Sequence, residues 1–438
     1  MTSESTLTPA SQLLPTAPTL LTPVSPNERI ASIDVLRGVA LLGILSINIW
    51  GFALPGIAFT DPPFVGGWSA INRGVWGLFH LLCEQKMMSL FSMLFGAGLV
   101  VMVQRSDARG MSLTGIYYRR ISWLLLFGLC HAFLLWDGDI LVPYALCGFV
   151  LYPFRRLRPS TQIVLGVLVF LCQVPPTIGV GLKELHLQQV TGPDNDQGTE
   201  EQRQTRRELE GLIFPSRDID AEIERHHQGY AAQFAKRAED NLSEFVPGFL
   251  LWSGPRAGGL MLIGMGLMQL GVFTATRSYR FYTTLAVLGY FLGLLVVGYG
   301  ILEMTSHGFD ALRQILWSGH FNYIGSLFVA LGHVGLVMII CKAGLLSWLT
   351  ARLAAVGRMA LSNYLMQSIL CTTIFEGWGF GLFGKPDRIE LLGVVAAIWL
   401  VQLAFSPLWL RYFRFGPMEW LWRSLTYWRR YPLLAVQT

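Results

Sequence analysis

The chain has 438 residues, of which 53% are hydrophobic and only 14% are charged, and its formal net charge is +5. Soluble globular domains average roughly 25% charged residues, so this composition excludes an ordinary soluble protein. Several apolar runs reach the roughly 20 residues that a helix needs to cross a bilayer. We therefore expect a polytopic membrane protein and interpret the positive charge as loop bias, which gives no reason to expect a nucleic-acid partner.

The first 28 residues differ from everything that follows. They contain five prolines and ten serines or threonines, and Arg29 is the first basic residue of the chain. A secretory signal needs a basic start and a continuous apolar core, and this segment has neither. Residues 1–28 are therefore predicted to form a disordered cytoplasmic tail.

Ten apolar segments follow and predict an all-α integral membrane protein of about ten transmembrane helices, with both termini in the cytoplasm. The predicted spans lie near residues 34–53, 87–104, 118–136, 140–154, 161–181, 251–274, 281–303, 322–341, 354–375 and 390–410.

The basic residues decide the orientation of these spans. With the N-terminus inside, the short cytoplasmic connections carry arginine pairs such as Arg119 with Arg120 and Arg155 with Arg156, whereas the outer WDGD turn at 136–139 has no Lys or Arg. Cytoplasmic loops of membrane proteins carry an excess of Lys and Arg. Only one orientation of this chain obeys that rule.

A polar insertion on the outer side divides the chain into two membrane halves. Its neighbouring His226 and His227 would point to different faces of a helix, and we interpret both as solvated surface histidines. The C-terminal tail mixes Trp, Tyr and Arg, which suits a helix at the inner membrane interface. The predicted regions are the first membrane half at 29–182, the insertion at 183–243, the second half at 244–411 and the interfacial tail at 412–438.

The six cysteines lie in or beside apolar segments, without a CxxC pair and without metal-ligand spacing to a histidine. We interpret them as small buried side chains and expect neither a disulfide nor a metal site. The sequence also lacks a Gly-x-Ser-x-Gly motif and a phosphate-binding loop. A nucleophilic-serine or metal mechanism therefore has no support from motifs.

The segment HAFLLWDGDILVPYA, residues 131–145, brings His131, Asp137 and Asp139 into apolar sequence. The Asp-Gly pair predicts a tight turn at the outer surface, and Asp139 can cap the next helix. His131 precedes Trp136 by five residues and lies about 7–8 Å below the turn, where an ionisable side chain normally faces the bundle interior. The alternatives are a histidine satisfied within the core and an aspartate that only caps.

Neighbouring spans bring further polar groups to the same depth, namely Asn48, Glu84, Lys86 and Tyr144. If these side chains face His131, they form a polar cavity open to the outside. A carboxylate that binds one imidazole nitrogen strengthens the other as a base, and Asp139, Asp137 or Glu84 could supply it. A simple interfacial pair of Glu84 with Lys86 is the alternative.

The ninth span contains GRMALSNYLMQSIL, in which Arg358, Asn363 and Gln367 are polar. Asn363 and Gln367 share a helix face and can bind a ligand or simply hydrogen-bond neighbouring helices. Arg358 and Arg37, near the cytoplasmic ends of their spans, could meet an anionic ligand from inside. For Arg37 the alternative is an arginine that reaches the inner headgroups.

Five segments carry a family resemblance: RIASIDVLRGVALLGILSINI, EQKMMSLFSMLFGAG, HAFLLWDGDILVPYALCG, GRMALSNYLMQS and FRFGPMEWLWRSLTY. In this order they resemble the bacterial YeiB-like family, built around domain of unknown function 418. The resemblance covers essentially the whole chain after residue 28 and implies a multi-pass protein of the bacterial cytoplasmic membrane. The positions matching the pattern are Asp34, Arg37, Asn48, Glu84, Lys86, His131, Gly138, Asp139, Arg358, Asn363 and Gln367.

The family is remotely similar to multi-spanning acyltransferases, which move an acyl group from cytosolic acyl-CoA to an acceptor and use a histidine. The resemblance thus implies an acyltransferase that takes acyl-CoA as donor, with no bound cofactor. The motifs do not match the catalytic histidine of those enzymes to His131, so the roles rest on the residues themselves: His131 would be the general base, Asp139 or Glu84 would orient it, and Lys86 and Asn48 would stabilise developing negative charge.

Whether the chain is an enzyme at all stays open at this point, because a proton-coupled transporter of small solutes or a non-catalytic scaffold would also bury such groups. The expected partners are the lipid bilayer and a small-molecule or envelope-glycan acceptor, and a homodimer is allowed.

Overall fold

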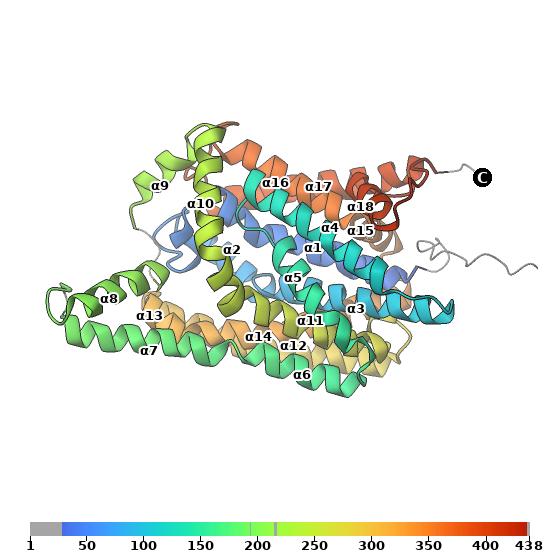
Figure 1. The fold of residues 1–438 in the computed structure, drawn as a ribbon, viewed down its shortest axis with the longest axis horizontal. Coiled ribbons are helices and arrows are strands. Elements are labelled where there is room, and N and C mark those ends of the chain that lie inside the picture. The colour runs from blue at the N-terminus through green and yellow to red at the C-terminus, as the bar shows by residue number, and fades with distance from the viewer. Residues whose placement is uncertain (1–28, 193, 214–216, 436–438) are drawn as a thin grey trace, which may run out of the picture.

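The computed structural model describes residues 29–192, 194–213 and 217–435, so the predicted N-terminal tail lies outside the described residues. The described chain is all-helical, and its only β-type pairing is an isolated bridge between Phe413 and Leu434. Most of the long helices run along the long axis of the molecule (Figure 1).

The α-helices are α1 (Ala31–Ala53), α2 (Ala70–Leu82), α3 (Lys86–Ala108), α4 (Thr114–Leu134), α5 (Leu141–Leu151), α6 (Pro159–Leu171), α7 (Val174–Thr191), α8 (Glu200–Ile213), α9 (Ile219–His226), α10 (Tyr230–Gly248), α11 (Gly254–Gln269), α12 (Tyr279–Ser306), α13 (Ala311–Arg313), α14 (Gly319–Ala343), α15 (Ser347–Arg358), α16 (Ala360–Phe375), α17 (Arg388–Tyr412) and α18 (Pro417–Tyr427). Short 3-10 turns lie at η2 (Gly56–Phe59), η3 (Tyr152–Arg156) and η5 (Val272–Thr274), and π-type turns lie at η4 (Phe249–Ser253) and η6 (Gln314–Ser318).

The helices confirm the all-α membrane class, and each predicted apolar segment lies largely within helices, but α2 was not among the predicted spans. Within the described residues, six helical stretches are long and apolar enough to cross a membrane: 31–53, 70–108, 159–191, 279–306, 311–343 and 388–412. The count of about ten crossings stays a prediction.

Two predicted spans are each divided into two helices. The fifth is interrupted between α6 and α7, where Pro175 and Pro176 follow Gln173. Proline lacks an N–H and clashes with the preceding turn, so a helix ends before such a pair. The ninth is interrupted at Met359, and a Cβ on Gly357 would lie 1.9 Å from the backbone oxygen of Asp34. The break therefore stands where α15 approaches α1 closely.

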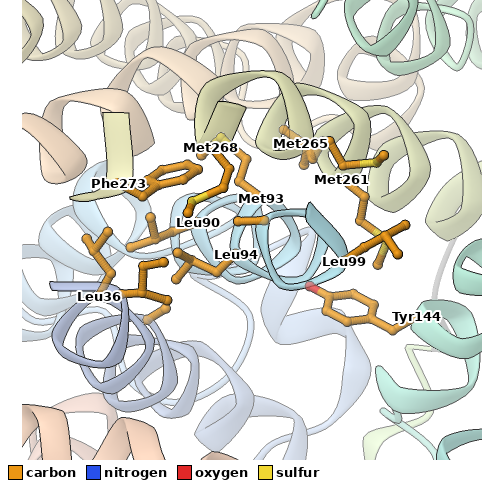
Figure 2. Packing of buried hydrophobic residues seen from close by; sticks show 14 of the residues in the cluster. Leu36, Leu90, Met93, Leu94, Leu99, Tyr144, Met261, Met265, Met268 and Phe273 are labelled. Carbon is orange, nitrogen blue, oxygen red and sulfur yellow. The ribbon is translucent and has the colours of Figure 1, made fainter. Parts of the chain in front are cut away.

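The apolar core is built around α3. Figure 2 shows Leu90, Met93 and Leu94 of this helix between the methionines of α11 and Leu36 of α1. The α3–α11 pair is close because glycines stand at the crossing: a Cβ on Gly264 would lie 2.0 Å from the Met93 carbonyl oxygen. Small residues that let backbones approach are the usual means of helix packing in membranes.

The two ends of the bundle differ in charge. The starts of α1 and α4 and the whole of α18 lie at one end (Figure 1), where Trp422 donates to the Arg120 carbonyl at 2.8 Å. This is the arginine-rich end that the sequence assigns to the cytoplasm. The helices α8, α9 and part of α10 lie toward the opposite end. We use the names inner end and outer end for them.

The insertion is packed on the outer end and is not a free polar loop. In α10, Tyr230 donates to the Leu134 carbonyl at 2.9 Å and Asn241 to the Ala132 carbonyl at 3.1 Å. Both acceptors lie in the last turn of α4, next to His131. These carbonyls have no partner within their own helix, so α10 satisfies groups that would otherwise lack one. The insertion thus covers the outer end of α4.

A buried ion pair and a stacked histidine hold the same surface. Arg237 of α10 approaches Glu376 at the end of α16 to 3.3 Å, with both side chains less than a tenth exposed. The His226 ring stacks on Phe383 with centroids 3.8 Å apart, whereas His227 is exposed. The two histidines do face different sides, but the prediction that both are solvated is wrong for His226.

The glycine crossing predicts a matched pair of effects on stability. Gly264→Ala should lower the free energy of unfolding by about 1–3 kcal/mol, because the added methyl group must push α11 away from α3. Gly393→Ala is the control, since Gly393 is exposed on α17 and no atom lies within 4 Å of the position that its Cβ would take. Thermal unfolding in detergent measures both variants. Equal melting temperatures would contradict the close-packing argument.

The stacking of His226 on Phe383 predicts that the docking of the insertion on the outer end depends on pH. Burial, with the nearby Arg225 and Arg237, lowers the pKa of His226 from 6.5 to about 4. A released insertion would bind a proton on His226 more readily than the docked one, so docking is strongest above about pH 6.5 and weakens as the pH falls toward 4. Limited proteolysis of residues 200–245 should therefore accelerate at acidic pH.

His226→Gln should reduce this acid sensitivity, because glutamine cannot take up the proton. His227→Gln is the matched control and should retain it. Acid sensitivity that is the same in both variants would show that another group titrates.

Candidate functional site

The candidate site is a buried set of three side chains, Asp139, His131 and Ser368, which come from separate segments of the bundle. Asp139 Oδ1 lies 2.8 Å from His131 Nδ1, and Ser368 Oγ lies 2.8 Å from His131 Nε2. His131 and Ser368 are each 1% exposed, and the Asp139 side chain is 3% exposed. The structure therefore brings together the histidine and one of the carboxylates that the sequence proposed as its partner.

The turn after α4 positions the aspartate. Asp139 uses its second oxygen, Oδ2, to accept from the Val142 N–H at 2.6 Å in the first turn of α5. Asp139 is thus both helix cap and histidine partner, and the two interpretations do not exclude each other. Asp137 is exposed and accepts from the Gly138 N–H at 3.0 Å, which makes it a turn residue.

The tautomer follows from these partners. An ionised carboxylate can only accept hydrogen bonds, so His131 carries its proton on Nδ1 and donates it to Asp139. Nε2 is then the acceptor, and the Ser368 hydroxyl, which also lies 3.4 Å from the Tyr364 carbonyl, can donate to it over 2.8 Å. The arrangement is that of a carboxylate-oriented general base in contact with a hydroxyl proton.

Glu84 and Lys86 lie in a second cluster with a different histidine. Glu84 Oε2 lies 2.6 Å from His80 Nδ1, and Lys86 donates to the His80 carbonyl and to Asn322. Asn322 also donates to Glu84 at 3.3 Å. Glu84 therefore orients His80 and not His131, and Lys86 has its hydrogen bonds within this cluster. The prediction placed Glu84 and Lys86 beside His131 because all three lie at a similar depth. Depth does not determine the helix face on which a side chain lies, and Glu84 and Lys86 face His80 instead.

Three other predicted residues make contacts between helices. Asn363 donates to Ser406 at 3.0 Å, and Gln367 donates to Gln402 at 2.9 Å, so both join α16 to α17. Tyr144 lies 2.6 Å from Ser92 through its hydroxyl oxygen. Asn48 is half-buried on α1, and the hydrogen bonds described for this chain do not join it to either histidine cluster.

A cavity of about 340 Å³ opens at the inner end between α1, α3, α4, α5, α15, α16 and α18. Ligand pockets in proteins commonly measure about 300–1,000 Å³. Along α1 its lining runs from Ile30 to Ile44, a depth of roughly 20 Å at about 1.5 Å per residue. The mouth carries the predicted Arg37 and Arg358 together with four further arginines, Arg29, Arg105, Arg120 and Arg423, against the carboxylates of Asp34 and Glu419.

Beyond its mouth, the cavity is lined by apolar side chains and ends beside the buried set of Asp139, His131 and Ser368. Leu41, Ile44 and Phe95 line its middle, and Ile140, the residue after Asp139, lines its far part. Tyr364 also lines it, and the Tyr364 ring packs against the His131 ring with centroids 4.9 Å apart. The Tyr364 ring therefore lies both on the cavity wall and against the histidine.

The outer side of the site is closed as well. The last turn of α4 carries the α10 contacts, and Trp136 stacks on Phe52 of α1 with centroids 4.0 Å apart. The predicted polar cavity open to the outside thus does not reach His131, which is 1% exposed, and the cavity described above has its arginine-lined mouth at the inner end. The physical reason is that α10 satisfies the carbonyls at the outer end of α4.

Ser368 and Tyr364 were not predicted from the sequence. They stand four residues apart in YLMQS, so they lie on one face of α16. Their four-residue spacing within GRMALSNYLMQS, a segment that carries the family resemblance, could have indicated that they lie together. His80 and Asn322 were also missed, because the sequence does not show that their helices meet beside Glu84 and Lys86.

Comparison with known proteins gives the family of the chain. The family model described as "Protein of unknown function (DUF418)" matches residues 267–429. The chain is 33% identical over 416 residues to "Uncharacterized protein YxaH" of Bacillus subtilis (strain 168), covering 93% of this chain and 96% of that protein. It is 32% identical over 418 residues to "Uncharacterized protein YeiB" of Escherichia coli (strain K12), covering 91% and 96%. The chain belongs to the YeiB and YxaH family, which the DUF418 model represents in its C-terminal part.

Proposed function

We propose that this chain is an acyltransferase of the bacterial cytoplasmic membrane, which takes an acyl group from cytosolic acyl-CoA and gives it to a hydroxyl or amine acceptor at the outer face. One observation carries the proposal. A deep cavity with an arginine-rich mouth at the inner end leads through apolar lining to Tyr364, directly against the Asp139–His131–Ser368 set.

The cavity suits a donor with a charged head and a long arm. Acyl-CoA carries its phosphates on the nucleotide and its thioester at the far end of the pantetheine chain. Arginines bind phosphates through charge-assisted hydrogen bonds, often with two parallel contacts. With the phosphates at Arg37 and Arg358, the narrow arm would occupy the apolar part and the thioester would approach Tyr364.

His131 would serve as the general base. Its Nδ1 proton is fixed by Asp139, so Nε2 is available to take a proton from a hydroxyl or amine and to return it to a leaving group. The site is water-excluded, which strengthens electrostatic interactions within it. Lys86 lies in the other cluster, so the developing charge on the carbonyl oxygen would be met by the Tyr364 hydroxyl instead.

A second candidate function, a proton-coupled transporter of small solutes, is favoured by the second cluster. His80, Glu84 and Lys86 are ionisable side chains at the junction of α2 and α3, and Lys86 is fully buried. Buried ionisable groups often relay protons in transporters. Solute uptake into proteoliposomes driven by a pH gradient, without acyl-CoA, would favour this candidate.

The base assignment predicts a specific loss of activity. Asp139→Asn should lower kcat for CoA release from acyl-CoA by about 100-fold or more, because the amide can no longer hold the Nδ1–H tautomer. His131→Ala should be at least as damaging. Purified protein with sugars and amines supplied as acceptors, and a thiol-reactive dye that detects free CoA, give the measurement.

Asp137→Asn is the matched control, since this exposed turn carboxylate has no contact with His131 and its loss should leave kcat within about twofold. Wild-type kcat in His131→Ala would remove the base from the proposal.

The arginine mouth predicts an effect on donor affinity alone. Arg358→Gln should raise KM for acyl-CoA by about tenfold, equivalent to about 1.4 kcal/mol, while kcat is little changed. The increase should shrink at high salt because exposed charges are screened. Arg411→Gln is the control, because Arg411 is exposed on α17 at the inner end and does not line the cavity. An equal effect of both substitutions would indicate a general charge effect.

A further inference from the structure

The two substrates of the proposed reaction approach from opposite sides of the membrane. The donor cavity opens at the inner end, while the outer side of His131 is covered by the turn before α5 and by α10. Ser368 lies eight residues after the start of α16 at Ala360 and seven before its end at Phe375, so it stands near the middle of that helix. Ser368 therefore lies between the inner cavity, from which the donor would come, and the outer end, from which the acceptor would come.

From this placement we propose that Ser368 is the nucleophile that carries the acyl group, as a covalent acyl-serine, between the inner donor and the outer acceptor. This inference rests on the proposed function and adds a residue to its mechanism. It makes the reaction a two-step exchange in which the substrates never occupy the site together.

The hydrogen-bond directions support this role. With the His131 proton on Nδ1 beside Asp139, the Ser368 hydroxyl is 2.8 Å from the basic Nε2 and can donate to it in place of its longer 3.4 Å contact with the Tyr364 carbonyl. A nucleophile and base within about 2.6–3.2 Å, with the base oriented by a third group, is the arrangement of an activated serine. The Val142 N–H fixes Asp139 in turn. All three side chains are therefore held in place before a substrate arrives.

The surroundings also suit a covalent intermediate. His131 and Ser368 are each 1% exposed, so water has little access to an ester formed there. Tyr364 lies one turn before Ser368 on α16 and is the boundary to the cavity, at 3% exposed. Movement of this one ring would connect the thioester to the serine while the outer side remains covered.

The chemistry balances in two steps. Ser368 Oγ attacks the thioester carbonyl carbon as its proton passes to His131 Nε2; the new C–O bond forms, the C–S bond breaks, and the sulfur takes the proton and leaves as CoA thiol. The acceptor hydroxyl or amine then gives its proton to His131 and attacks the ester carbon. The bond between Ser368 Oγ and the acyl carbon breaks, and Oγ takes the proton back from His131. No oxidant or reductant is required.

The experiment incubates purified full-length protein in lipid nanodiscs with radiolabelled acetyl-, butyryl- and palmitoyl-CoA, without an acceptor. Wild-type protein should release about one CoA per chain in a burst and retain the label, and mass spectrometry should find the acyl group on the peptide that contains Ser368. Ser368→Ala should show neither the burst nor the label, with CoA release reduced by about 1000-fold.

Two further variants separate chemistry from folding. Thr372→Val removes another buried hydroxyl one turn along α16, where Thr372 donates to the Ser368 carbonyl at 2.8 Å, and should keep the burst. Ser368→Cys retains a nucleophile and should form a thioester that neutral hydroxylamine removes, unlike the wild-type ester. Melting temperatures of all variants exclude those that do not fold.

The outcomes are distinct. Normal CoA release by Ser368→Ala, with label absent from wild-type protein, would overturn the serine intermediate and leave direct transfer assisted by His131. Absence of CoA release by wild-type protein with all three donors, with or without sugars and amines as acceptors, would overturn the proposed function itself.

Discussion

A histidine in the interior of a membrane bundle has little water to bind, so partners within the protein stabilise its ring nitrogens. For His131 these partners are Asp139 and Ser368, the latter 237 positions away in the chain. One imidazole thus joins α4, the turn before α5, and α16. Because the aspartate can only accept, the same two hydrogen bonds that satisfy the ring also leave Nε2 basic and place a hydroxyl beside it. The hydrogen bonds that satisfy the buried His131 ring are therefore the same contacts that the proposed general-base role requires.

The same constraint explains why the ionisable groups form two clusters. Lys86 is fully buried, and an unpaired ammonium there would be very costly; it donates to the His80 carbonyl and to Asn322. Glu84 is satisfied by the same neighbours, His80 and Asn322. Each cluster therefore compensates its own charges with the nearest polar groups. Neither needs the other, which is why groups at a similar depth do not converge on one pocket.

Local features were predictable from the sequence, and long-range ones were not. Apolar runs located the helices, and the pair of His131 with Asp139 could be foreseen because one tight turn brings them together. Ser368 could not, since it is one of several small polar residues on α16 and only the packing of α16 against α4 distinguishes it. The docking of His226 on Phe383 also depends on tertiary contact. The polar composition of the insertion indicated exposure but not the surface that it covers.

Two barriers in series distinguish this site from an open pathway. The Tyr364 ring lies on the wall of the inner cavity and against His131, and α10 covers the last turn of α4 on the outer side. A continuous polar channel would let ions run down the membrane potential, which is worth about 2.3 kcal/mol per elementary charge per 100 mV. In the proposed reaction, an acyl group held covalently between the two barriers would cross without such a channel if each barrier opened while the other stayed closed. A buried, water-excluded histidine and serine at that midpoint are what such an exchange requires.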